Sequence, residues 1–259
     1  MRPTRRVVLG ALSAFTLPLR AHADSADSSE ETSADADEGS VALTRYAAQH
    51  SGQRPAVLVL HGARGLELNP GAYKRYTERL AAEGIDAFLV QYFTTRDYQA
   101  LDPKVSTPES RDSYNTGRFA GWVKRISSVV TTVLARPESL GRLGLLGFSL
   151  GGYVAADTAV HDERIMALAI LYGGMPNAMV AQVKHMPPLL EIHGEADRNV
   201  PVAKGEELVK LAQAVGAPAE QIVYPGRGHG FDFSDTDPMT ADAVGRVVRF
   251  FQARLNSHH

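Results

Sequence analysis

Ser149 has the residue type and the neighbours needed for nucleophilic attack on an acyl carbon. It lies in the hexapeptide Gly147-Phe148-Ser149-Leu150-Gly151-Gly152, which fits the pattern G-x-S-x-G. A serine hydroxyl is a weak nucleophile until a neighbouring base accepts its proton. The pattern by itself also fits a tight turn with an incidental serine, so the flanking chain has to decide between the two interpretations.

The segments around Ser149 are those that a catalytic turn requires. The apolar run at residues 143–147 predicts a buried strand, and residues 151–161 predict a helix. A serine on the sharp turn between them projects from the top of a sheet, and glycines two positions to either side keep side chains out of the turn. Gly152 should let the helix approach the sheet closely. The helix N-terminus adds a partial positive charge where an oxyanion would form.

An acid and a histidine follow Ser149 in the order that such a nucleophile requires. Asp197 lies in the turn IHGEADRNVP, after the apolar run at residues 188–193. His229 lies in YPGRGHGF, after the run at residues 221–224. This arrangement predicts a triad in which Asp197 orients His229 and His229 deprotonates Ser149. Glu195 is an alternative acid.

The remaining histidines are weaker candidates for the base. His193 ends a predicted strand and precedes a glycine, so we interpret it as a structural histidine bonded to backbone. No acid in a paired pattern lies near His61, His161 or His185. The last two histidines, His258 and His259, are terminal.

Two backbone N–H groups should stabilise the oxyanion. One is that of Leu150, the residue after the nucleophile. The other lies in His61-Gly62-Ala63-Arg64-Gly65, which follows the predicted strand at residues 56–60 and places Ala63 as the second donor.

Substrate selection has weaker signals. Arg64 and Arg227 flank the predicted site in sequence; either could bind a substrate carboxylate, or be a solvated surface arginine. Tyr153, Tyr92 and the polar segment 94–116, predicted to be a long loop, could line the pocket, whereas Phe148 should pack beneath the turn.

The elements that position these residues alternate between strands and helices. Strands are predicted at 56–60, 87–92, 143–147, 166–172, 188–193 and 221–224, and helices at 73–83, 117–135, 151–161, 204–215 and 240–255. Such alternation predicts a mostly parallel α/β sheet with helices on both faces. Nothing marks an internal boundary, so residues 41–259 are predicted to form one domain.

The pattern of the N-terminal residues predicts an export signal. Arg2, Arg5 and Arg6 precede a short apolar stretch and the small-x-small sequence Ala21-His22-Ala23, so residues 1–23 are predicted to be a twin-arginine-like signal peptide. An uncleaved membrane anchor is the alternative. Residues 24–40 are rich in Ser, Ala, Asp and Glu and are predicted to be a disordered acidic linker. We therefore expect a periplasmic or secreted protein with no stable membrane insertion after cleavage.

Composition excludes several classes of protein. The 259 residues contain no cysteine, so neither a disulfide nor a cysteine-ligated metal can form. The formal net charge of −2 gives no reason to expect nucleic acid as a partner. A content of 44% apolar and 22% charged residues is ordinary for a globular domain.

The sequence resembles the dienelactone hydrolase family of α/β-hydrolases from about residue 54 to residue 255. The likeness is carried by VLVLHG, LGLLGFSLGG, IHGEADRNVP and YPGRGHGF. It implies an α/β-hydrolase fold with about eight mostly parallel strands, no cofactor or metal, and a small acyl or lactone substrate. The resemblance also shows two departures: Ser149 stands where the founding enzymes have cysteine, and Gly62 stands where they have glutamate.

These departures favour serine-esterase chemistry over the founding activity, because a serine with a histidine base needs no acid to control a thiol. We therefore expect a serine hydrolase that cleaves small carboxylic esters or lactones through an acyl-enzyme on Ser149. A peptidase, thioesterase or polyester hydrolase of the same fold is the alternative, and a non-catalytic secreted binding module is a third.

Overall fold

The structure, a computed structural model, describes residues 28–33, 39–49 and 51–256. The predicted signal peptide, most of the predicted linker and the two C-terminal histidines lie outside these residues. No helix within the described part of the chain is both long and apolar enough to cross a membrane.

An eight-stranded sheet forms the centre of the domain, in the order β1-β2-β4-β3-β5-β6-β7-β8. The strands β3 to β8 are parallel to one another, and β2 pairs antiparallel with both β1 and β4. Their bounds are β1 Ser28–Ser33, β2 Val41–Tyr46, β3 Arg54–Leu60, β4 Asp86–Gln91, β5 Ser139–Phe148, β6 Ile165–Leu171, β7 Leu189–Gly194 and β8 Ala219–Tyr224. The predicted mostly parallel sheet of about eight strands is confirmed.

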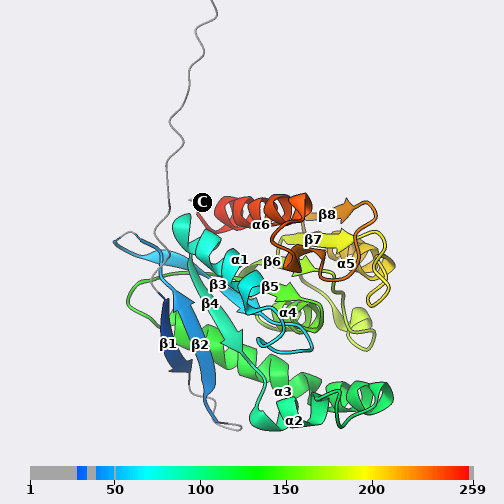
Figure 1. Cartoon of the computed structure of the whole chain (residues 1–259). Helices are drawn as coiled ribbons and strands as arrows, with labels where there is room; N and C mark the ends of the chain where they lie inside the picture. The colour runs from blue at the N-terminus through cyan, green and yellow to red at the C-terminus, as the bar shows by residue number, and fades with distance from the viewer. Residues whose placement is uncertain (1–27, 34–38, 50, 257–259) are drawn as a thin grey trace, which may run out of the picture.

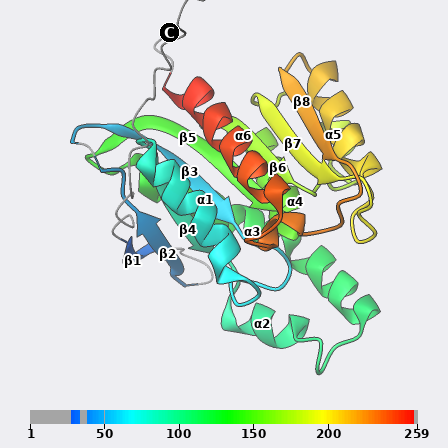
Figure 2. The same cartoon turned by 45° about the horizontal axis from the view of Figure 1, so that its top comes forward.

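Helices cover both faces of the sheet, as Figures 1 and 2 show. Two of them, α1 and α6, pack on one face; α3, α4 and α5 pack on the other. Continuous apolar runs such as β3, whose last six residues are all buried, fill the space between these layers. The bounds are α1 Pro70–Ala82, α2 Thr95–Leu101, α3 Pro108–Leu134, α4 Leu150–His161, α5 Ala203–Ala214 and α6 Pro238–Leu255.

Most of the segment 94–116 is helical, with a short connection at residues 102–107, so the prediction of a long loop was wrong. Thr94 begins α2 with a capping box to Asp97, and Thr107 begins α3 with a capping box to Ser110. A Pro follows Thr107 at the first helical position, which favours a helix start. In both views α2 and the first turns of α3 project beyond the sheet. Because little of the surface of α2 and of the first turns of α3 is buried, their residues are mostly polar. The sequence therefore lacks the apolar periodicity that would predict a helix here.

A strand within the predicted disordered linker is a second difference. Ser28–Ser33 forms β1, which adds to the edge of the sheet by pairing with β2. The strand has no apolar pattern, and its Glu31 forms ion pairs with Arg136 instead.

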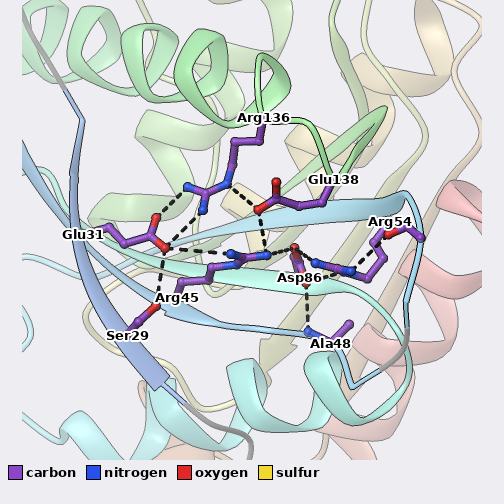
Figure 3. A network of polar contacts seen from close by, with 9 residues as sticks. Ser29, Glu31, Arg45, Ala48, Arg54, Asp86, Arg136 and Glu138 are labelled. Carbon is purple, nitrogen blue, oxygen red and sulfur yellow. Dashed lines mark hydrogen bonds and ion pairs between the residues drawn. The ribbon is translucent and has the colours of Figure 1, made fainter.

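Figure 3 shows the network to which Glu31 belongs. Arg45 of β2 lies 2.9 Å from Glu138 and 2.8 Å from Asp86. Arg54 of β3 reaches Asp86 Oδ1 at 3.0 Å. Backbone pairing and these charges hold β1 against the domain.

Candidate active site

Ser149 lies on the turn between β5 and α4 with a backbone conformation that side chains rarely adopt. Its φ of 52° and ψ of −119° lie outside the regions of helix and strand. Strain of this kind costs about 1–3 kcal/mol and persists where the surrounding fold fixes it. Here the Ser149 amide donates to Leu171 O at 3.0 Å, and its carbonyl accepts from the Gly152 amide at 2.8 Å.

Close backbone packing explains the glycines around Ser149. A Cβ on Gly147 would overlap the backbone of Gly151, and one on Gly151 would overlap the carbonyls of Leu60 and His61. A Cβ on Gly152 would lie 2.9 Å from Ile170 of β6, so this glycine lets α4 approach the sheet as predicted. Substituting any of the three would displace the turn.

The three residues of the predicted triad lie within hydrogen-bond distance of one another. His229 Nε2 is 3.0 Å from Ser149 Oγ, and His229 Nδ1 is 2.7 Å from Asp197 Oδ2. Ser149, Asp197 and His229 follow the carboxyl ends of β5, β7 and β8, which meet at one edge of a parallel sheet. Because a carboxylate can only accept, His229 Nδ1 carries the proton and its Nε2 lone pair faces the serine hydroxyl.

The carboxylate of Asp197 is fixed by backbone donors. Its Oδ1 accepts from the amides of Asn199 at 2.8 Å and Val200 at 2.9 Å. The side chain is buried, whereas the alternative acid Glu195 is exposed and accepts from the Gly226 amide. Asp197 is therefore the acid beside His229.

Tyr172 and Asp232 support His229, and neither was predicted from the sequence. The Tyr172 ring lies 4.7 Å from the His229 ring, and its hydroxyl donates to the fully buried Asp232 at 2.9 Å. Tyr76 of α1 donates to the other oxygen of Asp232, also at 2.9 Å. Burial raises the pKa of Asp232. An acid inside the apolar run FDF was the available sequence signal.

The loop after β3 is held by aromatic residues of the core. The His61 ring stacks on Tyr92 at 4.1 Å, and the Tyr92 hydroxyl donates to His61 O at 2.8 Å. Burial lowers the pKa of His61 to about 4, so this histidine is a neutral structural group. Tyr92 is fully buried, so the suggestion that it lines the pocket was wrong.

The predicted oxyanion donors are the amides of Leu150, at the start of α4, and Ala63, in the loop after β3. As the first residue of α4, Leu150 has no intrahelical acceptor for its N–H. In the loop after β3, the Gly62 amide already donates to the Tyr73 hydroxyl at 3.1 Å. The next amide along this loop is that of Ala63, the predicted donor. The Phe148 ring packs beneath the turn against Tyr73 and Tyr76, as predicted.

A cavity of about 520 Å³ adjoins this loop. Ala63 and Arg64 line one side, and residues of α2 and the turn after it line the other. The first part of the segment 94–116 thus lines a cavity, from α2 and from the turn after it. Asp97 anchors α2, because it accepts from Tyr114 at 2.9 Å and Arg118 at 2.8 Å.

Two other predicted substrate-binding residues lie apart from this cavity. Arg227 is paired with Asp237, whose Oδ2 is 2.8 Å from its Nε, so its guanidinium already has a partner. Tyr153 of α4 is half-buried and lies against Gly174. Burial and the charge of Glu207 raise the pKa of the Tyr153 hydroxyl. Arg64 is exposed and remains the arginine beside the cavity.

Two other histidines are bonded to groups other than Ser149. His193 is a structural histidine as predicted: its Nε2 donates to Val200 O at 2.9 Å. It also bonds Glu191, a buried acid in β7 that was not predicted from the sequence. His161 has an acid partner after all, since its Nδ1 lies 3.0 Å from Asp157 of the same helix. Among residues 28–33, 39–49 and 51–256, no group of three or more His, Asp or Glu side chains could hold a metal ion.

A mostly parallel sheet with a nucleophile turn after β5 and an acid and a histidine after β7 and β8 defines the α/β-hydrolase fold. Within it, the chain belongs to the dienelactone hydrolase family, whose sequence model matches residues 43–255.

Known proteins resemble this chain along most of its length. The "Putative carboxymethylenebutenolidase" of Yersinia pestis is 25% identical over 202 residues, 71% of each chain. A dienelactone hydrolase from Anabaena variabilis superposes with a TM-score of 0.68 at 19% identity, covering 88% of this chain and 99% of its own. The carboxylesterase EstE1 from a metagenomic library superposes with a TM-score of 0.68 at 17% identity, covering 90% of each chain.

Proposed function

We propose that this protein is a serine hydrolase that cleaves small carboxylic esters or lactones through an acyl-enzyme on Ser149. The observation that carries the proposal is the continuous contact from Asp197 through His229 to the Ser149 hydroxyl, at 2.7 and 3.0 Å. Membership of a hydrolase family supports it as well.

In the proposed reaction His229 Nε2 accepts the proton of Ser149 as its oxygen attacks the substrate carbonyl. The N–H groups of Leu150 and Ala63 donate to the oxyanion of the tetrahedral intermediate. The alcohol leaves with the proton from His229, and a water molecule, deprotonated by the same imidazole, releases the acid. Asp197 holds the required tautomer throughout.

We place a small substrate between Ser149 and the cavity that Ala63 lines, which no triad residue lines itself, with Arg64 as the residue that would bind a carboxylate on it. No protein or nucleic-acid partner is needed for this chemistry. For localisation we propose export, supported by the twin-arginine-like segment at residues 1–23. Replacing Arg5 and Arg6 by lysine should then leave the precursor in the cytoplasm of an expressing bacterium.

The test is hydrolysis of p-nitrophenyl esters of increasing acyl length, with lactones and peptide amides beside them. Wild-type protein should hydrolyse short esters or lactones fastest, and Ser149→Ala should lower kcat by about 10⁶-fold if the triad acts as a unit. Preference for amides would favour a peptidase. Equal hydrolysis by Ser149→Ala would refute the proposal.

A further inference from the structure

A second acid–histidine pair lies directly behind Asp197. Glu191 and His193 of β7 are both fully buried. Glu191 Oε1 is 2.6 Å from His193 Nδ1, and His193 Nε2 is 3.4 Å from Asp197 Oδ2. Polar contacts therefore continue through five side chains, in the order Glu191, His193, Asp197, His229 and Ser149.

The hydrogen bonds fix how many protons this pair holds. Because the carbonyl of Val200 can only accept, the Nε2 of His193 carries a proton. A second proton lies between His193 Nδ1 and Glu191, so the pair is neutral overall. Burial raises the pKa of Glu191. Burial by itself lowers the pKa of His193, but the hydrogen bond and charge of Glu191 outweigh it and the pKa is raised.

The fold reserves space for the carboxylate. A Cβ on Gly205 of α5 would lie 2.5 Å from either oxygen of Glu191, so a side chain at this position would displace the carboxylate. Gln221 of β8 also interacts with Glu191, and the charges of Glu191 and of Glu207 in α5 act on Tyr153 of α4. The pair is therefore enclosed by elements of the sheet and one helical layer.

We propose that Glu191 is a positioning residue of the active site, which holds positive charge on His193 against Asp197 and so sets the protonation equilibrium of His229. This inference rests on the proposed triad. The groups that face His229 are Asp197, Ser149 and Tyr172. Of these, Asp197 contacts the pair, so an effect of Glu191 reaches His229 through Asp197.

The direction of the effect follows from the charges. The Glu191 carboxylate makes the largest contribution to stabilising the protonated form of His193. Without this carboxylate the His193 ring becomes neutral. The negative charge of Asp197 then acts undiminished on His229 and stabilises its protonated form. The acid limb of the activity profile should move to higher pH.

The test replaces Glu191 by the isosteric Gln and follows His229 directly by histidine NMR, with His229→Gln to assign its signal. The His229 titration midpoint and the acid limb of kcat/KM should both rise by about 0.5 pH unit or more. His193→Gln should give the same rise, and the double variant no more than either single change, because the two residues act as one unit.

Asp157→Asn is the matched control. It removes the carboxylate of the other acid–histidine pair, which lies on α4 and does not contact the triad, so it should leave the His229 midpoint unchanged. Nitrogen NMR of wild-type His193 adds a measurement that needs no variant: both ring nitrogens should be protonated at neutral pH.

The proposal is overturned if Glu191→Gln lowers the unfolding temperature but leaves both the midpoint and the acid limb where they are in the wild type. A neutral His193 ring in the wild type overturns it too. Failure of the proposed function is a separate result: Ser149 would then not react with a fluorophosphonate probe, whereas the NMR midpoints still decide the role of Glu191.

Discussion

His229 Nε2 lies 3.0 Å from Ser149 Oγ, although 80 residues separate the two in sequence. Parallel strands bring them together, because the carboxyl ends of β5 and β8 lie at the same edge of the sheet. The strained backbone of Ser149 aims its hydroxyl at this edge, and Tyr172 and Asp232 support the histidine from behind. The relationship between nucleophile and base is therefore a property of the whole fold.

Asp197→Asn tests the role of the acid without changing its size. An amide at this position can donate to His229 Nδ1, which would favour the tautomer whose Nε2 is protonated and cannot accept from Ser149. We expect kcat to fall by about 10⁴-fold with the fold intact. Steady-state kinetics on a p-nitrophenyl ester measures the loss, and Glu195→Gln is the control that should keep near wild-type activity. A loss below tenfold would mean that Asp197 does not orient the base.

Arg64→Gln tests whether Arg64 binds a substrate carboxylate at the cavity. A charge-assisted hydrogen bond contributes about 1.5–3 kcal/mol, so KM for an ester with a free carboxylate should rise by about ten- to a hundredfold. kcat should change little, and a neutral ester of the same size should bind as before. Arg227→Gln is the control, because Arg227 is already paired with Asp237. Equal effects on charged and neutral esters would contradict the assignment.

His61 should make the protein sensitive to mild acid. Its pKa is lowered to about 4 by burial, so the unfolded chain binds a proton more readily. Stability from the neutral ring is present above about pH 6.5 and is lost as the pH falls from there towards 4, by about 3 kcal/mol in all. His61→Phe keeps the stacking on Tyr92 and should remove this slope. Urea unfolding at several pH values measures it; identical slopes in the two proteins would contradict the account.

Asp97 should act in a lower pH range. Burial by itself raises the pKa of this carboxyl, but hydrogen bonds from Arg118 and Thr94 outweigh it and lower the pKa to about 2. The stability that the carboxylate contributes, about 2 kcal/mol, is present above about pH 4 and is lost as the pH falls towards 2. Asp97→Asn should therefore be less stable than the wild type at neutral pH, and the difference should close in strong acid.

A difference that stays constant with pH would show that Asp97 acts through packing alone. Hydrogen exchange gives a second readout, because loss of the anchor should expose the amides of α2 but leave those of β5 protected.

Much of the fold and the candidate triad could be predicted from the sequence. Apolar runs such as residues 56–60 and 143–147 identify strands because both faces of a parallel sheet are buried. Ser149, Asp197 and His229 were predictable because each lies within five residues of the end of a predicted strand. The elements that were not predicted have weaker sequence signals. The strand β1 has no apolar pattern and is held by backbone pairing and by Glu31. The helix α2 is short and polar, and a capping box marks its start.

The residues that support the triad were harder to predict. Glu191 and Asp232 lie within apolar stretches, where an acid is unexpected, yet their partners His193, Tyr76 and Tyr172 are identified only in three dimensions. Arg227 shows the opposite case: its place beside His229 in sequence suggested a substrate contact, but its side chain pairs with Asp237.

The most direct test of the account is peptide mass spectrometry after reaction with a fluorophosphonate probe. We predict one adduct, on the peptide that contains Ser149, which is absent in Ser149→Ala and strongly reduced in His229→Gln. Well-folded wild-type protein that forms no adduct, or forms it at another residue, would contradict the assignment of Ser149 as the nucleophile.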